Sequence, residues 1–342
     1  MDPLVFEPFY RPQVWGGRRL QTSLGKPLPA EGTFGESWEI SAQPPHPTRV
    51  IEGPLAGATL IEAATRYPAD LYGARRTAPN CFPLLLKFLD CDALLSVQVH
   101  PNDSLAHTLR GDEFGKTEAW VVIEAEPTAR IYAGLTPGTT RADLERRLDD
   151  GTVAECLHVF TPRSGDCVFL PAGTVHTLGG GILAAEIQQS SDATFRLFDW
   201  NRLGADGRPR QLHRSEALAA IDWTAGPVRP VQDTPIRDLP REVRGENLVA
   251  CPYFNLDRFT LGEPLDVPYR DQYSIWVVLE AEVELASPVS KYRRTFHKGQ
   301  SMLLPATAGP LRWTPSKSGA LAVLLGICAP DEGETAFLRS QI

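Results

Sequence analysis

The sequence predicts a mainly β protein whose two halves share one fold, with a small helical insertion in the first half. Two observations support this prediction. Residues 165–176 form a short apolar strand, a turn rich in proline and glycine, and the start of another strand. Residues 276–282 and 299–306 then repeat the pattern of residues 120–126 and 165–172, with the same spacing from glycine to proline. The second half is therefore expected to repeat the fold of the first.

Taken in chain order, short runs of apolar and β-branched residues alternate with loops. Strands are predicted at 37–40, 48–51, 82–90, 94–100, 116–125, 182–188 and 195–200. Helical patterns occur within 59–76, at 141–149, where Thr140 and Asp143 resemble a capping box, and near 215–221. Residues 102–117 are predicted to be a polar loop.

The stretch 165–176 follows the pattern Gly-x5-Pro-x-Gly-x2-His, which ends at His176. This pattern is similar to the second motif of the cupins, which are double-stranded jelly rolls that often hold a metal near the mouth of the barrel. The resemblance implies a fold of two cupin-type jelly-roll barrels. If His176 is a metal ligand, its partners are expected upstream on neighbouring strands.

Three candidate partners lie upstream of His176: Gln98, His100 and Glu118. Ser96, Gln98 and His100 alternate with apolar residues, so a strand places the three on one face. If this polar face points into a barrel, it forms a binding site or a water channel. If it points outward, it is only solvated. The pattern alone favours neither interpretation. Two imidazoles, a carboxylate and an amide oxygen suit zinc, although these ligand types also bind iron or manganese.

We expect two domains joined by a connecting segment. The first, residues 1–222, would be the catalytic barrel, with the helical insertion near 139–158. Residues 223–250 would connect it to a degenerate barrel at 251–342. In the second copy, Pro310 falls where His176 stands in the first. One metal site per chain, in the first barrel, is therefore predicted.

Composition narrows the range of partners. The net charge of −8 comes without a cluster of lysine and arginine, which argues against general binding to nucleic acid or anionic membranes. The six cysteines form no Cys-x-x-Cys pair, which suits reduced thiols. The longest apolar run, at 320–329, is about half the length of a membrane span. With no visible signal peptide, the protein is expected to be soluble and cytoplasmic.

Several longer motifs resemble one family. Their order and content are similar to those of the type I mannose-6-phosphate isomerases, over roughly residues 8–222. The motifs lie at 35–41, 82–90, 96–101, 115–120, 171–176 and 186–201. Where cupins usually have His-x-His, this chain has Gln98-Val99-His100. The resemblance implies a zinc-dependent aldose–ketose isomerase that interconverts mannose 6-phosphate and fructose 6-phosphate.

The resemblance also implies roles for individual residues. The metal ligands, for one Zn²⁺ per chain, would be Gln98, His100, Glu118 and His176. The catalytic residues would be Arg196, Glu186 and Lys116, with Arg196 at the reacting end of the sugar. The substrate-binding residues would be Lys87, Ser96, Lys116 and Asp192. Lys87 and Lys116 are candidates for phosphate binding or, alternatively, for neutralising carboxylates inside the barrel.

Some questions stay open at this point. The general base is a metal-bound hydroxide, Glu186 or another acidic residue. Two other functions remain as alternatives: a metal-dependent cupin dioxygenase and a non-catalytic cupin that binds a sugar phosphate. The segments 15–17 and 35–39 are expected to provide turns and packing. His107, His158 and His213 are assigned to the surface or to packing.

Overall fold

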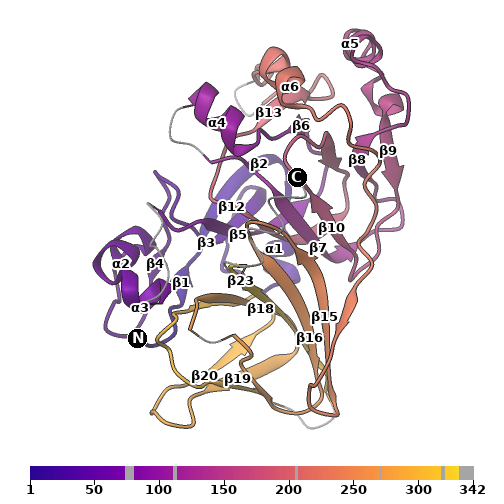
Figure 1. Ribbon diagram of the computed structural model, residues 1–342. Coiled ribbons are helices and arrows are strands. Elements are labelled where there is room, and N and C mark those ends of the chain that lie inside the picture. Colours follow the sequence, from indigo (N-terminus) through magenta and orange to yellow (C-terminus); the bar gives the residue numbers. More distant parts are fainter. Residues whose placement is uncertain (74–80, 111–113, 205–206, 270, 317–319, 331–342) are drawn as a thin grey trace.

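The computed structural model describes residues 1–342 except 74–80, 111–113, 205–206, 270, 317–319 and 331–342. In this described part, four larger antiparallel sheets form successive layers, from below helix α6 (Arg214–Ala220) down to strands β19 (Glu282–Ala286) and β20 (Arg293–His297), as Figure 1 shows. The predicted mainly β fold is confirmed. None of the described helices is long and apolar enough to cross a membrane.

The first half contains two facing sheets. One has the order β10-β7-β12-β5-β2-β3, with strands β2 (Phe9–Gly17), β3 (Phe34–Ile40), β5 (Leu84–Cys91), β7 (Glu118–Ala125), β10 (Cys167–Leu170) and β12 (Ile182–Gln189). The other has the order β13-β6-β11-β8-β9, with strands β6 (Val97–Val99), β8 (Ile131–Leu135), β9 (Leu157–Phe160), β11 (His176–Leu178) and β13 (Phe195–Phe198). Strands β1 (Phe6–Glu7) and β4 (Arg49–Val50) pair separately. Trp120, Val168 and Leu178 belong to the apolar cluster between the facing sheets.

The second half repeats this arrangement. Its larger sheet has the order β14-β15-β16-β23-β18-β21, with strands β14 (Thr234–Ile236), β15 (Val243–Ala250), β16 (Asn255–Leu261), β18 (Ser274–Glu280), β21 (Ser301–Leu304) and β23 (Ala322–Cys328). The smaller sheet joins β19 and β20 to β17 (Leu265–Asp266) and β22 (Arg312–Pro315). Strands β14 and β15 lie within the range 223–250 that was expected to be a connection. Residues 331–342, at the end of the expected second barrel, are outside the described residues.

The internal repeat predicted from the sequence is confirmed by strand register. Val168, three residues after Gly165, lies opposite Trp120. Met302, three residues after Gly299, lies opposite Trp276 in the same way. Both indoles are fully buried, so each half uses the same strand pair and the same tryptophan to fill its interior.

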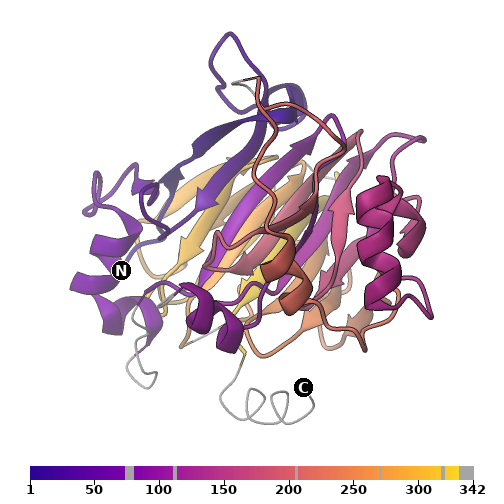
Figure 2. The ribbon, with the colours of Figure 1, turned by 90° about the horizontal axis from the view of Figure 1, so that it is seen from above.

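The two larger sheets pack face to face, and this contact joins the halves. Leu86 and Ile187 from the first half share one apolar cluster with Ile275, Leu303 and Ile327 from the second. Figure 2, viewed from above, shows the strands of both halves running in broadly the same direction, as in aligned sheet packing. The N-terminal segment adds to this contact, because Leu4 and Leu303 exchange two backbone hydrogen bonds.

This shared core leads to a stability prediction. Leu86 is 1% exposed, so Leu86→Ala is expected to lower the free energy of unfolding by about 2–5 kcal/mol. Because the cluster contains strands of both halves, scanning calorimetry should show one transition moving to lower temperature as a unit. Two separate transitions, with only one of them shifted, would contradict the shared core.

Helices cover the edges and the outer face of the first half. They are α1 (Arg19–Thr22), α2 (Leu60–Arg66), α3 (Pro68–Tyr72), α4 (Asp103–Arg110), α5 (Arg141–Asp150) and α6, together with a 3₁₀ helix at Val153–Cys156. Helix α5 starts with the predicted capping box and ends at Gly151, whose φ of 73° is left-handed. Part of the helical range predicted at 59–76, residues 74–76, lies outside the described residues.

The polar loop predicted at 102–117 is wrong in part, because α4 occupies its first half. The Asn102 side chain accepts a hydrogen bond from the Leu105 backbone N–H, as a helix N-cap does. Ala106 is completely buried and anchors the short helix. Leu105 also packs against an apolar cluster, but the helix has only 8 residues, fewer than the roughly 11–18 over which periodicity predicts a helix.

Candidate functional site

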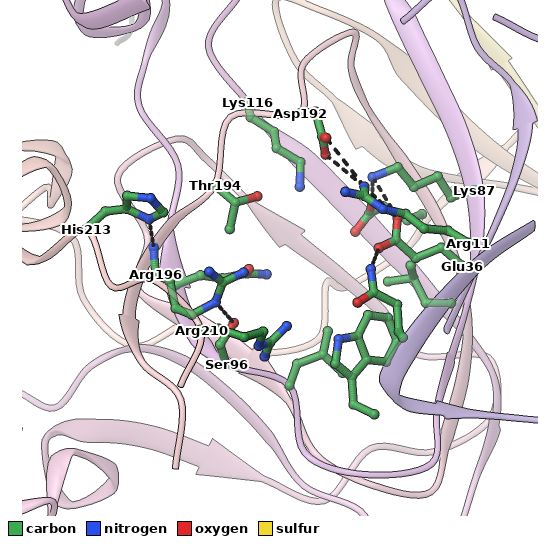
Figure 3. A pocket seen from close by; sticks show the side chains of 16 residues that line it. Arg11, Glu36, Lys87, Ser96, Lys116, Asp192, Thr194, Arg196, Arg210 and His213 are labelled. Carbon is green, nitrogen blue, oxygen red and sulfur yellow. Dashed lines mark hydrogen bonds and ion pairs between the residues drawn. The ribbon is translucent and has the colours of Figure 1, made fainter. Parts of the chain in front are cut away.

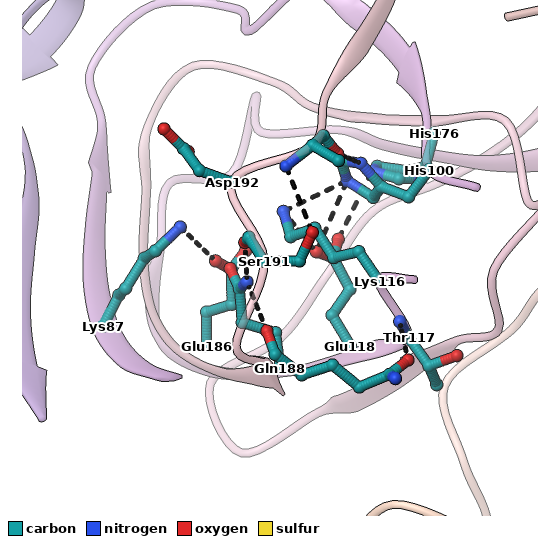
Figure 4. A network of polar contacts seen from close by, with 12 residues as sticks. Lys87, His100, Lys116, Thr117, Glu118, His176, Glu186, Gln188, Ser191 and Asp192 are labelled. Atoms are coloured by element: carbon teal, nitrogen blue, oxygen red, sulfur yellow. Dashed lines mark hydrogen bonds and ion pairs between the residues drawn. The ribbon is translucent and has the colours of Figure 1, made fainter. Parts of the chain in front are cut away.

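Three buried side chains converge between the sheets of the first half. His100 directly follows β6, while Glu118 and His176 are the first residues of β7 and β11. Glu118 lies between the imidazoles, with Oε2 at 3.5 Å from His100 Nε2 and Oε1 at 3.3 Å from His176 Nε2. All the ligand-type atoms lie within 4.8 Å of one another, and each side chain is at most 1% exposed. Figure 4 shows this cluster.

The hydrogen bonds of the two imidazoles fix their tautomers. His100 Nδ1 lies 2.8 Å from the Ala193 carbonyl, and His176 Nδ1 lies 2.8 Å from the Thr174 carbonyl. A carbonyl only accepts, so each Nδ1 donates and each Nε2 turns its lone pair toward Glu118. Burial lowers the pKa of His176 to about 4 and that of His100 well below its usual value, so both rings are neutral.

These groups fit a divalent cation. Within the described residues, Oε1 of Glu118 and Nε2 of His176 are buried without a hydrogen bond, and Oε2 of Glu118 has only the ammonium of Lys116 as a donor. Such orphaned acceptors are costly in a protein interior and are expected at an ion site. Two neutral imidazoles with one carboxylate form a common ligand set for catalytic zinc. The backbone carbonyls that accept hydrogen bonds from the two Nδ1 atoms fix the orientation of the rings, as is usual for histidines that bind a metal.

Lys116 stands beside this cluster. Its Nζ is 2.8 Å from Glu118 Oε2 and 3.1 Å from His100 Nε2. Burial alone would lower the pKa of Lys116, but Glu118 and Glu186 raise it above its usual value, so the group is a cation. Burial raises the pKa of Glu118 to about 7, while Lys116 acts in the opposite direction.

A cavity of about 380 Å³ lies beside the cluster, within the range of small-molecule sites. Figure 3 shows its polar walls. The residues that line it are Arg11, Gln13, Trp15, Glu36, Lys87, Leu89, Leu95, Ser96, Gln98, Lys116, Glu186, Asp192, Thr194, Arg196, Arg210 and His213. The cavity therefore contains a dense set of charged groups and few apolar ones.

Glu186 is held on one wall by neighbours across the sheet. In the register of β12 it lies opposite Lys87 on β5 and Trp120 on β7. Its Oε2 accepts a hydrogen bond of 2.9 Å from Trp120 Nε1, and its Oε1 is 3.3 Å from Lys87 Nζ. Burial would raise the pKa of Glu186, but Lys116 and Lys87 outweigh burial and lower it to about 2. Glu186 is thus an ionised carboxylate facing the cavity.

Neighbouring strands place Gln98 and Arg196 in a row with His176. Gln98 lies opposite His176 on one side and Arg196 on the other. Arg196 Nε donates to Ser96 Oγ at 3.3 Å, and its Nη1 donates to the Gln211 carbonyl at 2.9 Å. Asp192 accepts from Arg11 Nη1 at 3.4 Å.

Comparison with known proteins agrees with this geometry. Residues 4–118 match the profile of the type I phosphomannose isomerase catalytic domain. Mannose-6-phosphate isomerase ManA of Bacillus subtilis is 35% identical over 312 residues, which cover 91% of this chain and 95% of that protein. The chain belongs to the type I phosphomannose isomerase family. A mannose-6-phosphate isomerase of Streptococcus mutans is 32% identical over 90% of this chain and 93% of its own length.

Solved structures of the type I phosphomannose isomerase family extend the likeness to the fold. The crystal structure of the Bacillus subtilis mannose 6-phosphate isomerase superposes with a TM-score of 0.86 at 28% identity, covering 96% of this chain and 99% of that one. A putative mannosephosphate isomerase from Archaeoglobus fulgidus gives a TM-score of 0.73 at 20% identity, over 96% and 98% of the two chains, and shows the fold alone.

For this phosphomannose isomerase family member, the structure brings the residues predicted from the sequence to one place. His100, Glu118 and His176 form the buried cluster. The other predicted residues line the adjoining cavity: Gln98, Lys87, Ser96, Lys116, Glu186, Asp192 and Arg196. Both lysines contact carboxylates, as one of the two sequence interpretations anticipated.

Some cavity residues were missed. Trp15 and Glu36 line the cavity, although their segments were assigned to turns and packing, and His213 does so although it was assigned to the surface or to packing. Arg11 and Arg210 had no assignment at all. Strand alternation was the available signal for Arg11, because Arg11, Gln13 and Trp15 alternate along β2 and all three line the cavity. Arg210 lies in an irregular segment that carries no periodic signal.

Proposed function

We propose that this chain is a mannose-6-phosphate isomerase that interconverts D-mannose 6-phosphate and D-fructose 6-phosphate. The observation that carries the proposal is the buried cluster of His100, Glu118 and His176 beside a charged cavity, in a chain of this family. Moving a proton between C1 and C2 requires a base and a positive environment for the developing oxyanion. The cavity contains groups suited to both tasks.

We propose that His100, Glu118 and His176 hold one Zn²⁺ per chain, with Gln98 as a fourth ligand. The orphaned acceptors of the cluster support this assignment, as does the position of Gln98 directly opposite His176. When bound there, zinc would act as a Lewis acid toward the substrate oxygens. The lysine beside Glu118 balances charge that a buried carboxylate would otherwise leave uncompensated.

Glu186 is proposed as the base that moves the proton between C1 and C2. Its carboxylate is ionised, faces the cavity, and is oriented by Trp120 and Lys87 on both sides. Arg196 is proposed to stabilise negative charge on the substrate, because its guanidinium lines the cavity and forms no ion pair among the described residues. Lys87, Ser96, Lys116 and Asp192 are proposed to contact the sugar phosphate from the cavity walls.

The proposal is tested by turnover of mannose 6-phosphate in a coupled assay that detects fructose 6-phosphate. Activity is expected to disappear after treatment with a chelator and to return when Zn²⁺ is added back. Magnesium added to the same chelated sample is the control and should not restore it, because two of the ligands are imidazoles. No turnover with zinc-loaded protein, or oxygen consumption with Fe²⁺, would contradict the proposal.

A cytoplasmic location is also proposed. The six cysteines are all free, and five of them are buried. Free thiols of this kind are typical of a reducing compartment.

A further inference from the structure

One end of the cavity has an excess of positive charge. Asp199, which is 6% exposed, accepts two hydrogen bonds from Arg210, at 2.7 and 2.5 Å, and one from Arg202 at 2.6 Å. The positive charges of Arg210 and Arg202 both act on Arg196. Arg196 itself forms no ion pair with a carboxylate among the described residues. This end of the cavity thus has three guanidinium groups and one carboxylate, which pairs with two of them, in a protein whose net charge is −8.

At the other end of the cavity, the positive charges of the two lysines are balanced by neighbouring carboxylates. Lys87 lies between two carboxylates, 3.3 Å from Glu186 and 3.7 Å from Glu36. Lys116 lies 2.8 Å from Glu118. Figure 3 shows Arg196 and Arg210 on the side of the cavity opposite Lys87 and Arg11. A dianionic group entering the cavity therefore finds uncompensated positive charge at the arginine end.

Arg210 is prepared to bind an anion. Its Nε and Nη2 are held by Asp199, so the plane of the guanidinium is fixed. Its Nη1 forms no hydrogen bond with the described residues, and the side chain lines the cavity. A guanidinium oriented in advance loses little side-chain entropy when it binds a phosphate oxygen.

Ser96 completes the site. It is 4% exposed, and its Oγ accepts from Arg196, which leaves its O–H to donate. Ser96 is four residues from His100, about 13 Å along a strand. That separation accommodates an open-chain sugar with its first carbons beside the metal cluster and its sixth carbon near Ser96.

We infer that Arg210, together with Ser96, binds the phosphate group of the substrate at the end of the cavity opposite the metal cluster. The inference rests on the proposed function, because it assumes that the reacting carbons lie beside His100, Glu118 and His176. Arg210 then determines specificity for phosphorylated over free sugars and takes no part in proton transfer. Arg196 adjoins this phosphate site, because it donates to Ser96 Oγ, and it lies opposite Gln98 in the strand register.

The test compares zinc-loaded wild type with Arg210→Gln. The variant is expected to raise KM for mannose 6-phosphate by about 10- to 100-fold, because a hydrogen bond to a charged group is lost. The inhibition constant for inorganic phosphate should rise by a similar factor, while kcat/KM for unphosphorylated mannose stays within about threefold of wild type.

Arg202→Gln is the matched control. Arg202 binds the same carboxylate of Asp199 but does not line the cavity. It should change the phosphate inhibition constant by less than about threefold, because its charge acts only from a distance. Equal effects of the two variants would mean that Arg210 acts only by positioning Asp199, and would overturn the inference. Unchanged phosphate inhibition in Arg210→Gln would overturn it as well.

A binding measurement separates this inference from the proposed function. Calorimetric titration of zinc-loaded protein with inorganic phosphate requires no turnover. If wild type fails to convert mannose 6-phosphate, the proposed function is wrong. Weaker phosphate binding by Arg210→Gln than by wild type would still support the phosphate site, and equal binding would refute it.

Discussion

His176→Ala is expected to lose both bound zinc and turnover. His176 supplies a neutral Nε2 that has no hydrogen bond among the described residues, and alanine leaves only His100 and Glu118 from the buried cluster. Loss of a Lewis acid worth several kcal/mol corresponds to a decrease in kcat of about 10³-fold or more. Zinc content after gel filtration and the coupled assay measure the two effects on one sample.

His158→Gln is the control for that experiment. His158 lies on β9, outside both the cluster and the cavity, so this variant should keep its zinc and its activity. If His176→Ala retained stoichiometric zinc and turned over substrate at the wild-type rate, the cluster would not be the metal site. If the two variants lost zinc to the same extent, the loss would report damage to the fold.

Glu186→Gln is expected to retain zinc and to lower kcat by about 10²- to 10⁴-fold, the usual contribution of a general base. The amide keeps the shape of the side chain and its contact with Trp120 but cannot accept a proton from carbon. Incorporation of solvent deuterium into the sugar should fall together with kcat, which distinguishes failed proton transfer from failed binding.

Glu36→Gln is the matched control for Glu186→Gln. Glu36 also lines the cavity and lies near Lys87, at 3.7 Å, but it accepts hydrogen bonds from Gln13 and Trp38 and is not proposed to move a proton. We expect its kcat to stay within about tenfold of wild type. A larger decrease for Glu36→Gln than for Glu186→Gln would assign the base to Glu36.

The sequence predicted those parts of the site that lie on regular strands. Period-two alternation placed Ser96, Gln98 and His100 on one face, and the structure places Ser96 and Gln98 in the cavity wall and His100 in the cluster. The repeat of Trp120 and Trp276 predicted the doubled fold, because buried tryptophans require equivalent surroundings. Local patterns were sufficient wherever backbone geometry alone determines the direction of a side chain.

The parts that were not predicted depend on contacts that no local sequence pattern specifies. Arg210 faces the cavity because Asp199 holds it there, a contact within an irregular segment that no periodicity reveals. Glu36 joins the site because β3 pairs with β2 and β5, and the sequence does not specify the order of strands in a sheet. The charge balance of the two lysines likewise became visible only when carboxylates from β3, β7 and β12 were placed beside them.

The face-to-face contact of the two larger sheets also has a consequence for synthesis on the ribosome. The first half emerges before the strands that cover Leu86 and Ile187. At about 5–20 residues per second, the roughly 100 further residues that supply those strands take on the order of 5–20 seconds to make. During that interval a broad apolar surface of the nascent chain is uncovered. Newly made protein is therefore expected to depend on chaperones until β23, the last strand among the described residues, has left the exit tunnel.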